Sequence, residues 1–325
     1  MEVALLGTLA CEQRDRLSGL TNGAFELIPL PDDAPRDHVT TVLARTPAIV
    51  TMRYDRTMPA APNLRLLQVG GTGYDDIDFG WLAAGAVVCN AYGHEIPIAE
   101  YVILAMLQWC SRFIEAERSF RIDGHWRLGG RTAGPYQDEL AGKTVGILGL
   151  GRIGRAIVPR AKAMETTVIA CTRSPRELPP ELAWVTDPRG LDAFLQRSDF
   201  VVVTSSLTPD TEGLLNRERL ARMKPTGVVI NVSRGAIIDE EALYDALRTR
   251  TIGGAVIDAW YRYPTRGDLT VRPSRFPFHD LDNIYMTPHS SAWTEGMIQR
   301  RWQGIAANLG RFARGEPLDN VVHRG

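Results

Sequence analysis

Three glycines, Gly149, Gly151 and Gly154, have the spacing of a loop that could bind a dinucleotide. They follow an apolar, β-branched run at 145–148 and precede residues 155–164, whose apolar side chains recur at helical period. In such a strand–turn–helix unit the first glycine permits the sharp turn and the second admits a pyrophosphate. The third allows close helix packing, and the helix N-terminus favours negative charge. The sequence therefore predicts a dinucleotide site, and its loop also contains Arg152 and Ile153.

The end of the next predicted strand indicates which dinucleotide is bound. About 20 residues past such a turn, an acidic side chain binds the ribose of NAD, whereas an arginine accommodates the 2′-phosphate of NADP. This chain has Thr172, Arg173 and Ser174 there, with Arg176 close behind. A serine can donate a hydrogen bond to phosphate, and an arginine can pair with it bidentately. We therefore predict NADP as cofactor. NAD is the alternative, in which Arg173 is only an exposed residue at a strand end.

Arg234 and His289 each follow a predicted strand, at 227–232 and 284–287. An arginine can fix a carboxylate or a carbonyl oxygen by paired hydrogen bonds. A histidine can give or take the proton that accompanies hydride transfer. Taken singly, each could be an ordinary surface residue. Together, behind a dinucleotide loop, they indicate an oxidoreductase site.

Short apolar runs without period-2 alternation supply the elements that would position these residues. The runs lie at 3–6, 25–30, 48–52, 64–70, 86–90, 145–148, 167–172, 199–204, 227–232, 253–258 and 284–287. Helical stretches separate them, with two long helices at 99–120 and 294–312. This alternation predicts an α/β fold with two doubly wound parallel sheets. Ligands bind such sheets at the carboxyl ends of the strands, so we expect a cleft between two domains.

Composition bounds the class of protein. The chain has 325 residues, 44% hydrophobic and 23% charged, which is enough for two domains with cores of their own. The net charge of −1 and the lack of a basic block give no support for nucleic-acid binding. The most apolar run, 101–110, is too short to span a bilayer. Four widely spaced cysteines match no metal or disulfide pattern, and residues 1–3 do not resemble a signal peptide, so we expect a cytoplasmic protein without a metal.

Four blocks of sequence resemble the D-2-hydroxyacid dehydrogenase family. They are Gly-Gly-Thr-Gly-Tyr-Asp-Asp-Ile-Asp at 70–78, Ala-Glu-Tyr at 99–101, the glycine loop at 149–154, and the run 230–239 followed by Thr-Pro-His at 287–289. The resemblance implies a Rossmann cofactor domain at 99–288 and a flavodoxin-like substrate domain formed by 1–98 and 289–325. It also implies a homodimer packed through the cofactor domain, with the segment 123–142 at the interface.

The resemblance further assigns roles at matching positions. Arg234 is expected to bind substrate and polarise its carbonyl, while His289 protonates the alkoxide as hydride leaves the nicotinamide. Backbone N–H groups of Thr72 and Gly73 would hold the substrate carboxylate. The residues expected to border the nicotinamide are Ser205, Ser206, Leu207, Asn231, Val232, Ser233 and Asp258. The implied substrate is a small 2-keto or 2-hydroxy acid such as glyoxylate or hydroxypyruvate.

The chain departs from the family pattern at Tyr263, just before Pro264. Relatives have a glutamate there that bonds the catalytic histidine. A carboxylate favours imidazolium, whereas a phenol offers only a hydrogen bond. We therefore expect Tyr263 to join the catalytic group and His289 to titrate near its ordinary value of about 6.5, so that reduction fades above neutrality. Alternatively His94 or Glu95 supplies a replacement acid from the substrate side, unless these residues only cap the long helix.

Other features leave alternatives open. The segment 265–282, with Arg272 and Arg275, is longer than usual: it either covers the pocket mouth and adds positive charge, or is a plain surface loop. Trp293 either narrows the substrate pocket or packs in the core of the hinge helix.

Two further functions compete with ketoacid reduction. Tyr263 is compatible with a specialised relative that acts on formate, phosphite or a phosphonate. A protein of this fold could also be a non-catalytic NAD(P)H-sensing binding protein, although the presence of Arg234 and His289 weighs against that function.

Overall fold

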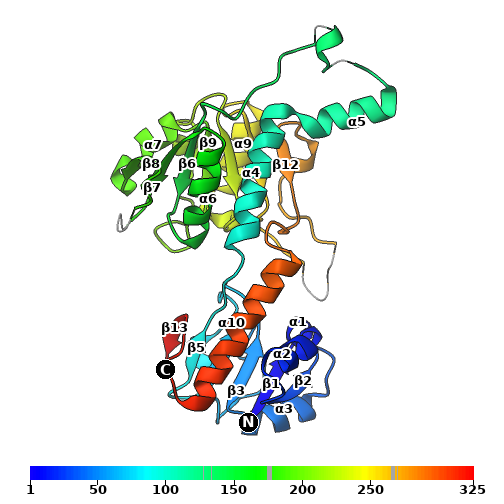
Figure 1. Cartoon of the computed structure of the whole chain (residues 1–325), viewed down its shortest axis with the longest axis vertical. Coiled ribbons are helices and arrows are strands. Elements are labelled where there is room, and N and C mark those ends of the chain that lie inside the picture. Colours follow the sequence, from blue (N-terminus) through cyan, green and yellow to red (C-terminus); the bar gives the residue numbers. More distant parts are fainter. Residues whose placement is uncertain (127, 133, 174–177, 265–267, 269) are drawn as a thin grey trace. The chain divides into compact units, whose positions relative to one another are not determined.

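The computed structural model describes residues 1–126, 128–132, 134–173, 178–264, 268 and 270–325. The chain forms two compact units (Figure 1): unit 1 consists of Met1–His94 with Thr294–Gly325, and unit 2 of Glu95–Trp293. The boundaries expected from the sequence, at 98 and 289, lie inside unit 2. A helix of unit 2 begins at Glu95, and the backbone of 290–291 is hydrogen-bonded to a carboxylate of unit 2.

Unit 1 contains a six-stranded sheet in the order β13-β5-β4-β3-β1-β2. Its strands are β1 (Glu2–Leu6), β2 (Glu26–Leu30), β3 (Ala48–Thr51), β4 (Leu66–Val69), β5 (Val87–Cys89) and β13 (Val321–Arg324). The first five are parallel, and β13 runs antiparallel to β5. The order 2-1-3-4-5 is that of a flavodoxin-like sheet, which confirms the predicted fold class. The sequence did not predict β13, because its four residues are half-exposed and half of them are polar.

Helices cover both faces of this sheet. The helices α1 (Thr8–Glu12), α2 (Arg14–Leu20) and α10 (Glu295–Arg314) share one core with it, whereas α3 (Arg36–Arg45) and the 3-10 turn Phe79–Trp81 lie over the other face. In Figure 1, α10 runs beside α2. A buried amide network fixes α10: Asn308 Nδ2 donates to Gln68 Oε1 at 2.9 Å, and the backbone N–H of Asp319 donates to Asn308 Oδ1 at 2.9 Å. The C-terminal residues are thereby tied to strand β4.

Unit 2 contains a seven-stranded sheet in the order β12-β11-β10-β9-β6-β7-β8, parallel throughout. Its strands are β6 (Thr144–Leu148), β7 (Thr167–Cys171), β8 (Leu182–Thr186), β9 (Phe200–Val203), β10 (Val228–Asn231), β11 (Gly254–Ile257) and β12 (Ile284–Met286). When the strands are renumbered from 1 at β6, the order is 3-2-1-4-5-6-7, which is the Rossmann order with one extra strand. The sequence did not predict β8, an edge strand whose residues are only partly buried.

Helices also cover both faces of this second sheet. One core contains α4 (Glu95–Ser111) and α6 (Arg152–Ala163), and the other contains α7 (Leu191–Arg197), α8 (Arg217–Leu220) and α9 (Glu240–Arg248). Short 3-10 turns occur at Gly130–Thr132, Pro188–Gly190, Gly235–Ile237 and Phe278–Asp280. Within the described ranges, no helix combines the length and the apolar character needed to cross a membrane.

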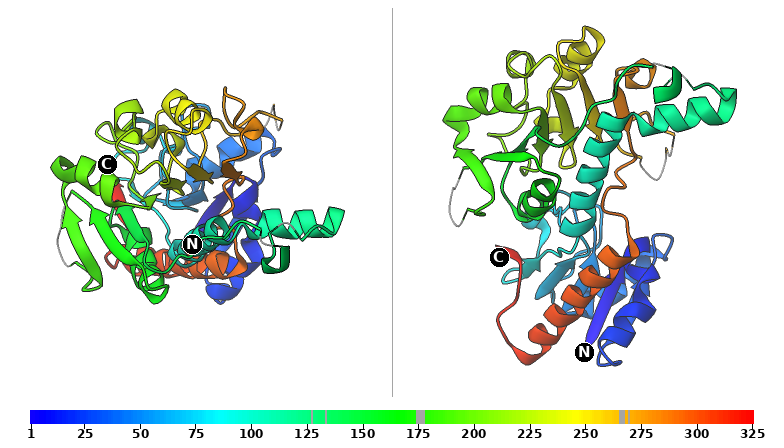
Figure 2. Two further views of the ribbon diagram at one scale, coloured as in Figure 1. Left: turned by 90° about the horizontal axis from the view of Figure 1, so that it is seen from above. Right: turned by 45° about the horizontal axis from the view of Figure 1, so that its top comes forward.

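The single helix predicted at 99–120 was wrong. The structure has two helices, α4 and α5 (Phe113–Asp123), because Arg112 between them adopts a left-handed conformation with φ 50° and ψ 33°. Helix α5 extends away from the sheet of its own unit (Figure 2), and its apolar side chains are exposed, with Phe113 at 64% and Ile122 at 67%. An apolar pattern at helical period continued through the break, so periodicity alone could not locate it.

Candidate active site

The glycine loop after β6 has no room for a side chain at Gly149 and Gly154, but it is open at Gly151. Gly149 has φ 101°, and a Cβ there would lie 2.5 Å from the backbone nitrogen of Ser205. A Cβ at Gly154 would lie 2.5 Å from the carbonyl oxygen of Gly149. At Gly151, by contrast, a Cβ would have no described atom within 4 Å. These are the three roles that a pyrophosphate-binding turn requires: a tight turn, an open approach and close packing.

The surroundings of this loop fit a dinucleotide. Gly151 is the N-cap of α6, a 12-residue helix whose N-terminus would face bound phosphates. Ser205 Oγ is buried and has no hydrogen-bond partner among the described residues, so a polar group of a ligand could satisfy it. Arg152, exposed at the start of α6, lies 3.6 Å from the carboxylate of Glu95. Ile153 packs against the core behind the loop. A bound nicotinamide dinucleotide would therefore meet backbone N–H groups and this serine.

At the ribose end, β7 stops at Cys171 and is followed by Thr172 and Arg173. Thr172 is half-buried, and its backbone N–H donates to the carbonyl of Thr186 at 3.0 Å. The Arg173 side chain is 66% exposed, and its Nη1 lies 3.8 Å from the carboxylate of Asp210. The predicted Ser174 and Arg176 lie outside the described residues. The described part of this site therefore offers a neutral hydroxyl and an accessible guanidinium.

The turn after β10 presents Arg234. Asn231 braces this turn at both ends: its Oδ1 accepts from the N–H of Ser233 at 3.1 Å, and its Nδ2 donates to the Arg234 carbonyl at 3.0 Å. The Ser233 hydroxyl donates to the carbonyl of Ser205. Arg234 is half-buried, and its Nη1 donates to the Ser233 carbonyl at 3.0 Å. The preceding Val232 is buried at 6% exposure. The arginine is thus held at the carboxyl end of the sheet, next to the loop after β9.

Asp258, after β11, organises the turn that carries His289. Its carboxylate is 1% exposed and accepts from Thr287 Oγ1 at 2.6 Å, Ser290 N at 2.8 Å and Ser291 N at 3.1 Å. His289 lies inside this clamp with φ 56°. The sequence suggested Asp258 only as a neighbour of the nicotinamide. Its contacts show that it positions the histidine turn.

Tyr263 and His289 are in direct contact. The Tyr263 hydroxyl accepts from the backbone N–H of Trp260 at 3.0 Å and lies 2.8 Å from His289 Nδ1. The phenol can donate its one proton to Nδ1 only when the imidazole is neutral and its proton is on Nε2. An imidazolium would have to donate from Nδ1, and the phenol would then turn its own proton elsewhere. The phenol can therefore bond either the neutral ring or the imidazolium, and unlike a carboxylate it adds no charge that favours the imidazolium.

The surroundings of His289 favour its neutral form. Desolvation by neighbouring protein atoms lowers the pKa of His289, and the charge of Arg234 lowers it further, although Asp258 opposes both. Burial raises the pKa of Tyr263, so the phenol retains its proton. The expectation that His289 titrates near its ordinary value was therefore wrong: its pKa lies below that value.

In unit 1, the predicted carboxylate loop is locked to His94. Thr72 Oγ1 donates to the Ala91 carbonyl at 2.7 Å and lies 2.9 Å from His94 Nδ1. Because the hydroxyl proton is used on Ala91, His94 must donate from Nδ1. His94 is 8% exposed, and Gly73 is half-buried. His94 is thus part of the loop scaffold.

The structure bears on three further residues or segments for which the sequence left two roles open. Trp293 is 64% exposed, which contradicts the alternative that it packs in the core of the hinge helix. Glu95 begins α4 beside Arg152, in agreement with a role at the helix end. In the segment 268–282, Ser274 Oγ and Arg275 N donate to Glu240 Oε1 at 2.7 and 3.0 Å, and the Arg275 guanidinium lies 3.1 Å from Oε2 of the same carboxylate. The carboxylate of Glu240 therefore balances the charge of Arg275, as expected for a surface segment that packs on α9.

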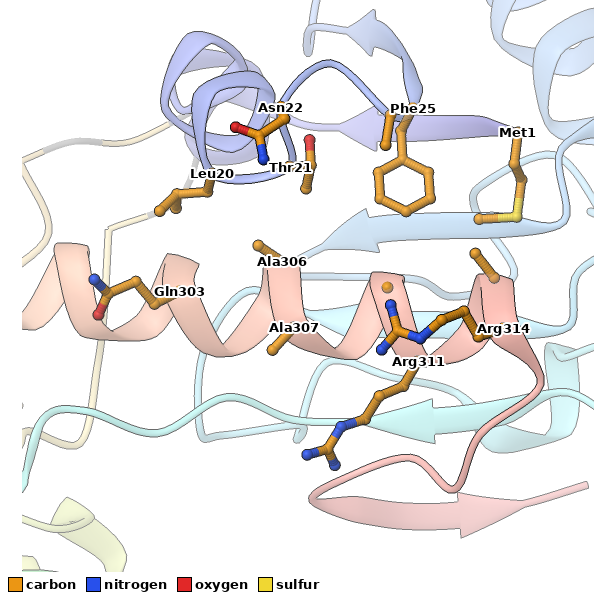
Figure 3. A pocket seen from close by; sticks show the side chains of 13 residues that line it. Met1, Leu20, Thr21, Asn22, Phe25, Gln303, Ala306, Ala307, Arg311 and Arg314 are labelled. Carbon is orange, nitrogen blue, oxygen red and sulfur yellow. The ribbon is translucent and has the colours of Figure 1, made fainter.

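A groove of about 670 Å³ in unit 1 lies between α2 and the C-terminal half of α10 (Figure 3). Alanines of α10 form its floor, and Arg311 and Arg314 lie at one end, paired with Asp319 and Glu316. The predicted site residues that the structure describes do not line this groove. In the described ranges, no group of three His, Cys, Asp or Glu side chains could hold a metal ion.

Residues 103–291 match the family model of the D-isomer specific 2-hydroxyacid dehydrogenase NAD-binding domain. The chain belongs to this family. It is therefore an NAD(P)-dependent 2-hydroxyacid dehydrogenase, which transfers hydride between the nicotinamide and a 2-ketoacid.

Relatives of this dehydrogenase cover almost its whole length. A glyoxylate reductase from Thermococcus onnurineus is 34% identical over 292 residues, 85% of this chain and 83% of the relative. The structure of an NADPH-dependent glyoxylate/hydroxypyruvate reductase from Sinorhizobium meliloti, in complex with NADP and sulfate, has a TM-score of 0.79 at 27% identity and covers 99% of this chain and 98% of the other. An NAD-dependent formate dehydrogenase from Staphylococcus aureus, in complex with NAD, has a TM-score of 0.78 at 25% identity, with both chains fully covered.

The Tyr263 contact predicts the pH dependence of ketoacid reduction. Reduction needs a proton from His289, and its lowered pKa means that kcat/KM falls as pH rises through a midpoint below about 6.5. Tyr263→Glu should move this midpoint upward. Each unit by which the pKa of His289 rises should increase the rate at pH 8 about tenfold. Tyr263→Phe, the control that removes only the hydroxyl, should keep the low midpoint. NMR titration of His289 measures the pKa directly, and an unchanged midpoint in Tyr263→Glu would contradict the argument.

Proposed function

We propose that this dehydrogenase reduces a small 2-ketoacid, such as glyoxylate or hydroxypyruvate, with NADPH. The observation that carries the proposal is the group of Arg234, Tyr263 and His289, held at the carboxyl ends of β10, β11 and β12 in the same sheet as the glycine loop. The names of the relatives from Thermococcus onnurineus and Sinorhizobium meliloti support this substrate class.

The residues divide the chemistry between them. A bound nicotinamide supplies the hydride that reduces the keto carbon. Arg234 donates hydrogen bonds to the carbonyl oxygen and stabilises the negative charge that grows there. His289 then gives its proton to that oxygen, so ketoacid, NADPH and one proton become hydroxyacid and NADP⁺. Asp258 keeps the histidine turn in place throughout, because its three acceptor contacts hold 287–291.

The substrate carboxylate belongs, in this proposal, on the loop of Thr72 and Gly73. Backbone N–H groups at the carboxyl end of a strand are suited to an anion. Thr72 is fixed by its bonds to Ala91 and His94, and Asn90 Nδ2 donates to the Thr72 carbonyl at 2.8 Å. A loop fixed in this way loses little entropy when it binds the carboxylate. The exposed Trp293 would then limit the size of the substrate side chain.

A homodimer would cover the apolar surface of unit 2. Large apolar side chains are exposed on α4 and on the segment 113–126: Leu104, Phe113, Ile114, Phe120, Ile122 and Trp126. An apolar patch of this kind marks an interaction site. A second copy of this chain is the occupant that the family resemblance implies, and two copies related by a twofold axis would bury the same patch on both.

A second candidate follows from the Tyr263 contact. Oxidation of formate to carbon dioxide transfers a hydride without protonating a carbonyl oxygen. A neutral His289, which its lowered pKa favours, could donate a hydrogen bond from Nε2 to the substrate in such a reaction. We rank this candidate second, because the more similar relatives named above are ketoacid reductases.

Cofactor oxidation tests the proposed function. With glyoxylate and hydroxypyruvate we expect NADPH turnover at pH 6, and with formate or phosphite no reduction of NADP⁺ or NAD⁺. Arg234→Met should lower kcat/KM by about 10²–10³, and His289→Gln by about 10²–10⁴. Formate or phosphite turnover without ketoacid reduction would favour the second candidate. Tight NADPH binding without turnover of any of these acids would favour a binding protein.

The role of Arg173 predicts cofactor preference. Arg173→Ala should raise KM for NADPH by about 10–100-fold, the equivalent of one charge-assisted bond to phosphate, and leave KM for NADH unchanged. Arg222→Ala is the matched control, because Arg222 is also an exposed arginine 3.8 Å from a carboxylate in unit 2. Equal effects of Arg173→Ala on both cofactors would contradict a contact with the 2′-phosphate.

The apolar patch predicts the oligomeric state. The double variant Phe113→Glu and Ile122→Glu should shift sedimentation from dimer to monomer, because it places charge where apolar surface is buried. Leu178→Glu, at an exposed leucine elsewhere in unit 2, should leave the dimer intact. A wild-type monomer at micromolar concentration would reject the dimer.

A further inference from the structure

Trp260 is a buried tryptophan at the carboxyl end of β11, two residues after Asp258. It is 5% exposed, and its indole Nε1 donates to the carbonyl of Thr287 at 2.8 Å. The backbone N–H of His289 donates to the same carbonyl at 3.1 Å. The indole therefore holds the acceptor to which the backbone of the proposed proton donor is bonded.

The backbone of Trp260 lies against the elements that carry the rest of the catalytic group. Its N–H donates to the Tyr263 hydroxyl at 3.0 Å, and that hydroxyl lies 2.8 Å from His289 Nδ1. A Cβ built at Gly235, the residue after Arg234, would lie 2.4 Å from the carbonyl oxygen of Trp260. The turn that presents Arg234 thus packs directly on this backbone. A single residue contacts the turns of Arg234 and His289 and the side chain of Tyr263.

Aromatic packing fixes the plane of the indole. The ring of Phe278, which is 1% exposed, meets the Trp260 ring with centroids 6.0 Å apart and planes at 71°. Phe278 makes a similar edge contact with Tyr244 of α9, at 5.4 Å and 84°. Such edge-to-face arrangements are favourable for aromatic pairs. Because packing already restricts the indole, its N–H loses little further entropy in bonding Thr287.

The indole bond is not needed to satisfy the Thr287 carbonyl, which already accepts from the N–H of His289. Its effect is to fix the direction of that carbonyl. Asp258 holds the donors of the 287–291 turn, and Trp260 holds an acceptor of the same turn. With both contacts in place, the backbone of His289 is restrained through its donors and through its acceptor.

We propose that Trp260 is a positioning residue for ketoacid reduction, whose indole N–H keeps the His289 turn in the conformation that gives the proton. The inference rests on the proposed function, in which His289 is the proton donor. Trp260 acts through His289. Its effect is therefore expected in kcat and not in the affinity for NADPH.

Substitution by phenylalanine tests this role, because it keeps a buried aromatic ring and removes the indole N–H. Trp260→Phe should lower kcat for glyoxylate by about 5–30-fold, with Kd for NADPH within about threefold of wild type. Phe278→Leu, which loosens the indole without removing it, should lower kcat by a smaller factor. Trp184→Phe is the matched control, because Trp184 is a half-buried tryptophan of unit 2 that packs under Arg197, and it should leave kcat unchanged.

A double-mutant cycle separates positioning of His289 from general support of the fold. In a His289→Gln background, Trp260→Phe should cause no further loss of kcat, because its effect passes through the histidine. A further loss of the same size in that background would make Trp260 a structural residue and overturn the proposal.

NMR titration of His289 gives a readout without turnover. Loosening the turn should admit water to the ring and move its pKa up toward about 6.5 in Trp260→Phe, because desolvation is the largest cause that lowers this pKa. Trp184→Phe should not move it. Unchanged kcat and an unchanged pKa of His289 in Trp260→Phe would overturn the proposal. If wild type reduces no ketoacid but this pKa rises only in Trp260→Phe, the proposed function fails while the positioning of His289 stands.

Discussion

The buried carboxylate of Asp258 is the interaction on which the geometry of the active site depends. A carboxylate at 1% exposure is tolerated only when hydrogen bonds replace its hydration. Here a hydroxyl and two backbone N–H groups from the 287–291 turn do so. Because Thr287 Oγ1 donates to Asp258, the Tyr101 hydroxyl, 2.7 Å away, must donate to Thr287. The chain of donors from Tyr101 to Asp258 ties α4 to the turn, and Trp260 Nε1 adds a bond to the Thr287 carbonyl at 2.8 Å.

The contacts of Asp258 stabilise the left-handed backbone conformation of His289. A left-handed conformation costs a non-glycine residue of the order of 1 kcal/mol, and the residue stays there only when its surroundings impose it. The N–H groups on the residues after His289 are fixed on one carboxylate, and Tyr263 holds the ring itself. Removing Asp258 would therefore disturb a proton donor that it does not touch. The fold supplies the position of the histidine, and Tyr263 supplies a hydrogen bond to its Nδ1 without adding charge.

The sequence predicted the parts of the fold that repeat a simple physical pattern. Buried parallel strands are continuous apolar runs, so the strand before the glycine loop and ten further strands could be located from the sequence. The partly exposed edge strands β8 and β13 could not be located. The sequence did not predict the helix break at Arg112, because a left-handed residue does not interrupt apolar periodicity. In the sequence, Arg301 was not singled out as a buried residue. Its spacing of four from Met297 and from Ile305 places it on the buried face, and that spacing was the available signal.

Hydroxyl groups bond the Nδ1 atoms of two histidines in different ways. Thr72 donates its proton to the Ala91 carbonyl and so accepts from His94 Nδ1, whereas the Tyr263 oxygen, which already accepts from the N–H of Trp260, can bond His289 Nδ1 as donor or as acceptor. A sequence motif records neither the Ala91 carbonyl nor the Trp260 N–H. A glutamate at 263 would fix the charge of His289 by Coulomb attraction. A phenol leaves that charge to the balance between desolvation, Arg234 and Asp258, so protonation of His289 responds to whatever enters the site and excludes water from it.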